Sequence, residues 1–149
     1  DHLYLHFFPT RRSSDLNSIM AAIGLVQLKY LDQDNSYRRQ LASWYRENFV
    51  GHEHVQVVPV APGCESSTHL LQIRVNNRDQ VMLALNEHQI YPGVHYQDNT
   101  EYRMYAFAKG SCPRAAKACK EIISLPLHLG LSKKDIDAIS DLVIRYAGK

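Results

Sequence analysis

The sequence predicts an α/β fold, a two-layer sandwich in which helices cover a small mixed or antiparallel sheet. The first observation is that segments with helical spacing of apolar residues alternate with short runs rich in valine, isoleucine and leucine. The second is the length of 149 residues, which suits about one domain. The third is the composition, 45% hydrophobic and 21% charged, which is typical of a globular protein.

The clearest element is a long helix over residues 16–50. Its apolar stripe contains Ile19, Ile23, Tyr30 and Leu31 in the first part and Leu41, Trp44, Tyr45 and Phe49 in the second. Ser14 or Asp15 can cap its start, and Gly51 is placed to end it. Residues 32–40 are polar, and the helix could bend or be interrupted there.

Seven shorter elements follow the long helix. In order, we expect strands at 55–60 and 68–75, a helix at 79–88, a short strand at 94–96, a helix at 113–121, a strand at 122–126 and a helix from 133. Pro113 suits the first position of its helix, and Pro126 ends the last strand because proline has no N–H to donate. Ser132 and Asp135 form a variant capping box for the last helix.

Two of these helices have a clear apolar face. In the helix at 79–88, Val81 and Leu85 are expected to face inward, with Leu83 as a third candidate. The apolar face of the last helix consists of Ile136, Ile139, Leu142, Val143 and Tyr146.

Composition and motifs argue against several classes of function. The sequence has no run of about 18 apolar residues, so no membrane span is expected. The net charge of +2 is too small to indicate nucleic-acid binding. Cys64, Cys112 and Cys119 form no CxxC pair, which favours reduced thiols in a cytoplasmic setting. His52 and His54 have no third ligand nearby in the sequence, so no metal site is expected.

The first 16 residues are expected to be a non-native leader, which leaves 17–149 as the predicted domain. The chain opens without Met, and the run Phe8-Pro-Thr-Arg-Arg-Ser-Ser-Asp-Leu16 resembles a translated sequencing adapter. The alternative is a native edge strand, with Leu3, Leu5 and Phe7 on one face, followed by a turn.

Several short motifs carry a resemblance to a known family. They are Ala21-Ala-Ile-Gly-Leu-Val-Gln-Leu28, Arg38 and Arg39 with Ala42 and Tyr45, Ser67-Thr-His-Leu-Leu-Gln-Ile-Arg74, Gly93-Val-His-Tyr96, Pro113 with Ala115, and Ile123-Ser-Leu-Pro-Leu-His128 before Leu131 and Ser132. In this order they resemble the C-terminal region of DegT/DnrJ/EryC1/StrS sugar-nucleotide aminotransferases, over residues 17–144. The resemblance implies the C-terminal small-domain fold of fold-type I aminotransferases.

The resemblance also implies an activity. Family members use pyridoxal phosphate to transfer an amino group to an NDP-ketosugar in amino-sugar biosynthesis, with glutamate as the expected donor. The resemblance further implies a cytoplasmic homodimer. Because the family's cofactor lysine lies upstream of Asn17, we expect a C-terminal fragment, inactive alone, with no catalytic or cofactor-binding residue. Lys109 precedes a glycine in a loop, but its surroundings do not suggest the burial that a Schiff-base lysine needs.

The resemblance places three candidate substrate-binding residues, His69, His95 and Tyr96, on the side of the domain that faces the active-site cleft. His69 lies between apolar neighbours and is equally well explained as a hydrogen-bonded core histidine. Residues 99, 100 and 102 could line the same cleft, although the solubility of a loop explains them as well. A second histidine that commonly follows His-Tyr in the family is missing, so its contact cannot be carried over.

Two readings from other classes stay open. One is a free-standing small α/β module that binds a ligand or a partner. The other is a structural oligomerisation domain. A reading frame that extends upstream and contains a lysine after a serine- or glycine-rich turn would favour the enzyme.

Overall fold

The computed structural model describes residues 17–148, and these divide into two compact units, one ending at Asp34 and one beginning at Asn35. The predicted leader, residues 1–16, lies outside the described residues, so that expectation stays a prediction. No helix in the described part of the chain is long and apolar enough to cross a membrane.

The helix predicted over 16–50 is interrupted, and the predicted place of interruption is wrong. It forms α1 (Ser18–Leu28) and α2 (Leu31–Asn48), whereas the polar residues 32–40 are continuous helix. At the break, the N–H groups of Lys29 and Tyr30 bond to carbonyls only three residues back, at 3.2 and 3.0 Å, which tightens the turn. Asp32 and Asp34 lie in the first turn of α2, where the helix dipole favours negative charge.

The start of α1 also differs from the prediction. The side chain of Asn17, rather than that of Ser14 or Asp15, caps the helix by accepting a hydrogen bond from the Met20 N–H at 2.9 Å. At the other end of the long helical segment, Gly51 has a φ of 81°, which confirms it as the stop that follows α2.

The described sheet has three antiparallel strands in the order β1 (Gln56–Val57), β2 (Leu71–Arg74) and β3 (Ile122–Leu125). This confirms the small sheet and its antiparallel form. β1 is shorter than predicted, because Pro59 cannot extend its pairing. The strand predicted at 94–96 is wrong, since only Gly93 pairs there, in a single bridge to Ser124.

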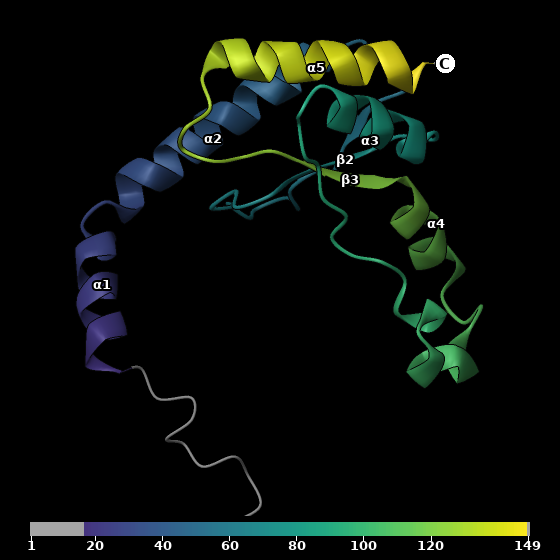
Figure 1. Ribbon diagram of the computed structural model, residues 1–149, viewed down its shortest axis with the longest axis horizontal. Helices are drawn as coiled ribbons and strands as arrows, with labels where there is room; N and C mark the ends of the chain where they lie inside the picture. The colour runs from purple at the N-terminus through teal and green to yellow at the C-terminus, as the bar shows by residue number, and fades with distance from the viewer. Residues whose placement is uncertain (1–16, 149) are drawn as a thin grey trace, which may run out of the picture. The chain divides into compact units, whose positions relative to one another are not determined.

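Helices α2, α3 and α5 form one core with the sheet, and α4 contacts β2 without a buried residue. The three later helices are α3 (Arg78–Glu87), α4 (Pro113–Glu121) and α5 (Lys133–Ala147), and the short 3₁₀ helices η3 (Asn99–Glu101) and η4 (Arg103–Ala108) lie between α3 and α4 in the chain. Figure 1 shows α5 lying along α3, with β2 and β3 on one side of both helices. The buried apolar residues are Leu41, Ala42, Tyr45, Phe49, Val55, Leu71, Ile73, Val75, Val81, Leu85, Ile123, Leu125, Ile136, Ile139, Val143 and Ala147.

The predicted faces of α3 and α5 are confirmed with one exception. Val81, Leu85 and the named residues of α5 are buried or pack against the core. Leu83 is 61% exposed, so its inward placement is wrong. The capping box of Ser132 and Asp135 is present at the start of α5.

The first unit, described by itself, is unusually apolar on its surface. None of the residues of α1 is buried. Large apolar side chains at more than one third exposure are Ile19, Met20, Ile23, Leu25, Val26 and Leu28. The predicted stripe is therefore helical but not covered within this unit.

Candidate functional site

An open groove of about 670 Å³ lies between the segment after Gly93 and helix α4. Its lining combines one predicted site residue, Tyr96, with three that the sequence suggested would share its cleft, Asn99, Thr100 and Tyr102. Tyr96 is 74% exposed and Tyr102 is 52% exposed. The groove therefore presents two phenol rings and several polar groups to solvent.

Asp98 organises the wall of this groove. Its carboxylate accepts hydrogen bonds from the Thr100 N–H at 2.9 Å and the Thr100 hydroxyl at 2.8 Å, which caps η3. These bonds, the backbone one first, lower the pKa of Asp98 from its ordinary value, so the group is ionised at neutral pH. The fixed negative charge favours a ligand that offers hydroxyl or amide donors on this side.

His95 lies next to the groove but does not line it. Its ring Nδ1 is 2.9 Å from the hydroxyl of Ser124 in β3, and its carbonyl accepts a bond from the side chain of Gln72 in β2 at 2.7 Å. The His95 ring meets the Tyr96 ring edge to face, with centroids 5.2 Å apart. The histidine is half-buried and held by the sheet, whereas its neighbour projects into the groove.

His69 does not join the other two predicted residues. It lies in a bend just before β2, its side chain is exposed, and it does not line the groove. Exposure removes the core-histidine explanation, because a core residue would be covered by neighbours. A substrate contact by His69 stays a prediction.

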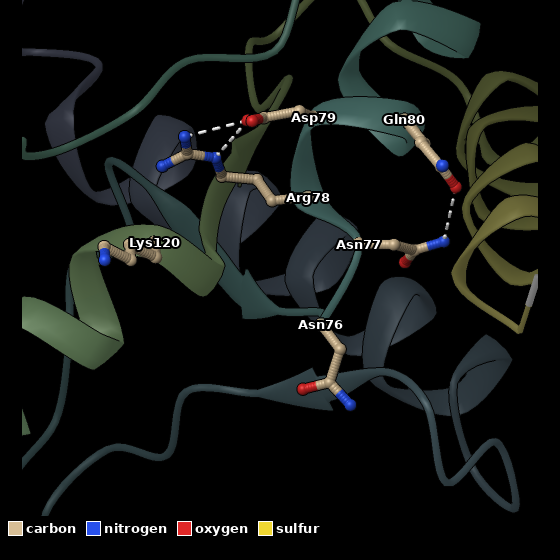
Figure 2. A pocket seen from close by; sticks show the side chains of 6 residues that line it. All are labelled: Asn76, Asn77, Arg78, Asp79, Gln80 and Lys120. Atoms are coloured by element: carbon tan, nitrogen blue, oxygen red, sulfur yellow. Dashed lines mark hydrogen bonds and ion pairs between the residues drawn. The ribbon is translucent and has the colours of Figure 1, made fainter.

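A second open pocket, of about 480 Å³, lies at the start of α3 (Figure 2). Arg78 could attract an anion there, but it is already engaged: its Nε donates to Asp79 at 2.8 Å and its Nη1 donates to the Cys119 carbonyl at 2.6 Å. Asn77 donates to Gln80 at 3.4 Å. The pocket also contains Lys120, which is exposed, but the Arg78 guanidinium is already paired and none of the predicted site residues lines the pocket, so it is a poorer candidate than the groove.

The lysines in residues 17–148 are all exposed. Lys109 lies 3.5 Å from Glu101, with 68% of its side chain exposed. A Schiff-base lysine needs burial or neighbouring cations to react as a neutral amine, and this one has a carboxylate beside it. The described residues therefore do not fit covalent attachment of pyridoxal phosphate. In the same range, no cluster of three or more His, Cys, Asp or Glu side chains is placed to hold a metal ion.

Sequence reasoning missed several residues around the site. Ala115 and Cys119 from α4 and Cys112, which directly precedes that helix, complete the groove, and Ser124 holds the His95 ring. A usable signal existed for Ser124, since it is a lone polar residue inside an apolar strand. No comparable signal marked the cysteines, because their approach to the groove depends on how α4 packs.

Comparison with known proteins identifies the family. The model of the DegT/DnrJ/EryC1/StrS aminotransferase family matches residues 12–144. The chain belongs to this family. Among curated relatives, it is 27% identical over 136 residues to the dTDP-3-amino-3,6-dideoxy-alpha-D-galactopyranose transaminase of Aneurinibacillus thermoaerophilus. That alignment covers 90% of this chain and 37% of the relative, so the chain spans little more than a third of the length of that relative.

Solved structures with the same fold are also aminotransferases. S. venezuelae DesV in complex with a ketimine intermediate superposes with a TM-score of 0.81 at 27% identity, covering 87% of this chain and 36% of DesV. Spr1654 of Streptococcus pneumoniae, described as a sugar aminotransferase and solved in its PLP form, gives a TM-score of 0.81 at 26% identity, covering 89% and 36%. The chain thus has the fold of the corresponding part of sugar aminotransferases.

Proposed function

We propose that this chain is the C-terminal small domain of a pyridoxal-phosphate-dependent aminotransferase that acts on an NDP-ketosugar, with glutamate as the amino donor. Family membership over most of the chain carries this proposal. The relative from Aneurinibacillus thermoaerophilus is a dTDP-amino-sugar transaminase, which makes a nucleotide-linked ketosugar the favoured substrate class.

In this proposal the chain binds and orients the sugar, and the lysine that holds the cofactor belongs to a part of the enzyme outside this chain. Pyridoxal phosphate, when bound, supplies the electron sink for amino transfer. Within residues 17–148 no lysine is buried, which supports the assignment of the cofactor lysine to another part of the enzyme. The active unit would be a cytoplasmic homodimer.

The groove beside His95 is the proposed contact surface for the sugar nucleotide. Exposed phenol rings such as Tyr96 can stack on or hydrogen-bond to a sugar or a base. Asn99 and Thr100 add an amide and a hydroxyl group that can form hydrogen bonds with sugar hydroxyls. The ionised carboxylate of Asp98 can accept hydrogen bonds from the same sugar hydroxyls. His95 contributes one ring nitrogen from the edge of the groove. His69 is a further, more distant candidate.

The competing readings, a free-standing ligand-binding module or an oligomerisation domain, predict no role for this chain in amino transfer. Recovery of the reading frame upstream distinguishes them, because only the aminotransferase requires a lysine-bearing catalytic region there.

The test is His95→Ala in the enzyme expressed from the complete reading frame. Loss of one hydrogen bond to bound sugar costs on the order of 1 to 3 kcal/mol, so kcat/KM for a dTDP-ketosugar should fall roughly fivefold to 150-fold. The melting temperature should fall less than in a core truncation, because the variant removes the hydrogen-bond partner of the Ser124 hydroxyl but no buried apolar side chain.

Ile139→Ala is the matched core control, because Ile139 is 4% exposed in α5 and does not line the groove. It should lower the melting temperature and leave kcat/KM per folded molecule unchanged. If His95→Ala instead unfolds the domain while the folded fraction remains fully active, His95 is a structural histidine and the site assignment fails.

A further inference from the structure

Two adjacent strands hold His95 at separate points. Gln72 in β2 donates from its side chain to the His95 carbonyl at 2.7 Å, and the Ser124 hydroxyl in β3 lies 2.9 Å from ring Nδ1. Gln72 and Ser124 are directly opposite each other in the β2–β3 register. The backbone and the ring of the histidine are therefore both fixed to the same place on the sheet.

Ser124 is a buried hydroxyl with a single side-chain partner. It is 3% exposed and lies between the buried residues Ile123 and Leu125. Its backbone N–H and carbonyl are both bonded to Gly93, at 2.7 and 2.9 Å. The His95 ring is the one hydrogen-bond partner of the Ser124 hydroxyl within residues 17–148. Because a buried hydroxyl without a partner is costly, this contact favours one orientation of the ring.

Gly93 supplies the space that the ring occupies. A Cβ atom added at Gly93 would lie 2.6 Å from His95 Cε1 and 3.2 Å from Nδ1, well inside van der Waals contact. Gly93 is absent from the positions with positive φ, so its backbone does not require glycine. The requirement at this position is therefore steric: the ring packs directly over the Gly93 Cα atom.

The other ring nitrogen of His95 remains available. No hydrogen bond to Nε2 occurs within the described residues. The one buried side-chain polar atom without a partner in that part of the chain is Asn77 Oδ1, so Nε2 is reached by solvent. The ring thus has one nitrogen bound to the sheet and one free to meet a ligand.

We propose that Ser124 and Gly93 are positioning residues for His95: the Ser124 hydroxyl fixes the ring through Nδ1, and the missing Gly93 side chain lets the ring lie flat there, so that Nε2 meets a polar group of the substrate. This inference rests on the proposed function of His95. It adds two residues that do not touch the substrate but determine how the histidine meets it.

The positioning itself can be tested in the 149-residue chain by NMR of the His95 ring. In the unmodified chain, the order parameter of the ring C–H groups should match that of rigid structure, because the Ser124 hydroxyl can bond to Nδ1 in either tautomer. In Ser124→Ala, the order parameter should fall below about 0.6. Ser124→Thr, which keeps the hydroxyl, should keep the ring rigid.

Ser140→Ala is the matched control, because Ser140 is also fully buried but its hydroxyl donates to the Ile136 carbonyl inside α5. It should leave the His95 signals unchanged. Gly93→Ala is a second, independent variant: it keeps Ser124 but should displace the ring and lower the same order parameter. If both Ser124→Ala and Gly93→Ala leave the His95 ring signals as they were, the positioning proposal is overturned.

A kinetic arm separates this inference from the proposed function. In the complete enzyme, Ser124→Ala should lower kcat/KM for the nucleotide sugar about twofold to tenfold and leave the half-reaction with the amino donor unchanged. If the ring signals change but sugar turnover does not, the contact stands and the substrate role of His95 is wrong. Equal losses in both half-reactions would indicate a general structural effect and overturn the positioning role.

Discussion

Two leucines of α3, two positions apart, have opposite surroundings. Leu85 is fully buried in the core, whereas Leu83 is 61% exposed. A shift of two residues rotates a side chain by about 200° around a helix, so both cannot face the same side. Burial also changes the chemistry of a side chain. The hydroxyl of the buried Tyr45 donates to the Pro126 carbonyl at 3.0 Å, and desolvation raises the pKa of this phenol.

These surroundings predict different costs of truncation. Leu85→Ala should destabilise the chain by roughly 2 to 5 kcal/mol, because it leaves a cavity in the core. Leu83→Ala should change stability by less than about 0.5 kcal/mol. Urea unfolding followed by circular dichroism measures both values. Equal costs for the two variants would contradict the orientation of α3.

At the scale of elements, the start of α5 is defined by two side chains. The Ser132 side chain accepts from the Asp135 N–H, and the Asp135 carboxylate accepts from the Ser132 N–H at 2.8 Å and from its hydroxyl at 2.6 Å. The hydrogen bond from the Ser132 side chain has the largest effect and the bond from the Ser132 N–H the next largest. Together they lower the pKa of Asp135 from its ordinary value of 3.8. The carboxylate therefore favours the folded state only while it is ionised.

The capping box predicts both a mutational and a pH effect. Ser132→Ala should cost about 0.5 to 2 kcal/mol. Because the folded-state pKa of Asp135 is depressed, its contribution is fully present above pH 3.8 and is lost as the pH falls below that value. Melting temperatures of the unmodified chain and of Asp135→Asn between pH 2 and pH 6 check this. The difference between the two should shrink in acid; a constant difference would show that the carboxylate is not linked to folding.

Local patterns predicted most elements, and the exceptions have physical reasons. The capping box and the boundaries at Pro113 and Pro126 depend on neighbouring residues only, and all were predicted. The break at residues 29–30 was not, because apolar side chains continue on both sides of it. The strand predicted at 94–96 failed because the His95 carbonyl bonds to the Gln72 side chain instead of to a neighbouring strand.

The candidate site also has one part that the local sequence predicted and one part that it did not. Tyr96 and the polar residues after it were predicted together because they are neighbours in sequence, and they line one groove. The contact of His95 with Ser124 joins residues 29 positions apart and depends on the register of Gly93 with β3. No local pattern specifies such a pairing, so the sequence predicted His95 as a site residue but did not predict its contact with Ser124.

At the scale of the whole molecule, two features stand out: the chain is much shorter than its relatives, and its first helix, α1, is apolar and not buried. It aligns with 37% of the curated relative from Aneurinibacillus thermoaerophilus. Helices that are apolar on all sides are normally buried in globular proteins, yet no residue of α1 is buried. Both observations support the proposal that this chain supplies one domain of a larger enzyme.

We therefore expect the 149-residue chain to bind no pyridoxal phosphate covalently, because its described lysines are exposed and Lys109 lies beside a carboxylate. The measurement is a visible spectrum after mixing with the cofactor and removing the excess, before and after borohydride reduction. A stable, reducible absorbance at stoichiometric level would overturn the proposal that the cofactor lysine lies outside this chain. Lys109→Arg would then show whether that lysine is responsible.

The bridge between Gly93 and β3 also protects the sheet. Alternate residues of β3 direct their backbone groups away from β2, and these are Ile122 and Ser124, followed by Pro126. The Ile122 N–H bonds to the Ala118 carbonyl, the Ser124 N–H bonds to Gly93, and Pro126 has no N–H. This outer edge therefore offers no free donor to an incoming strand, and it resists the edge-to-edge association through which exposed strands begin to aggregate.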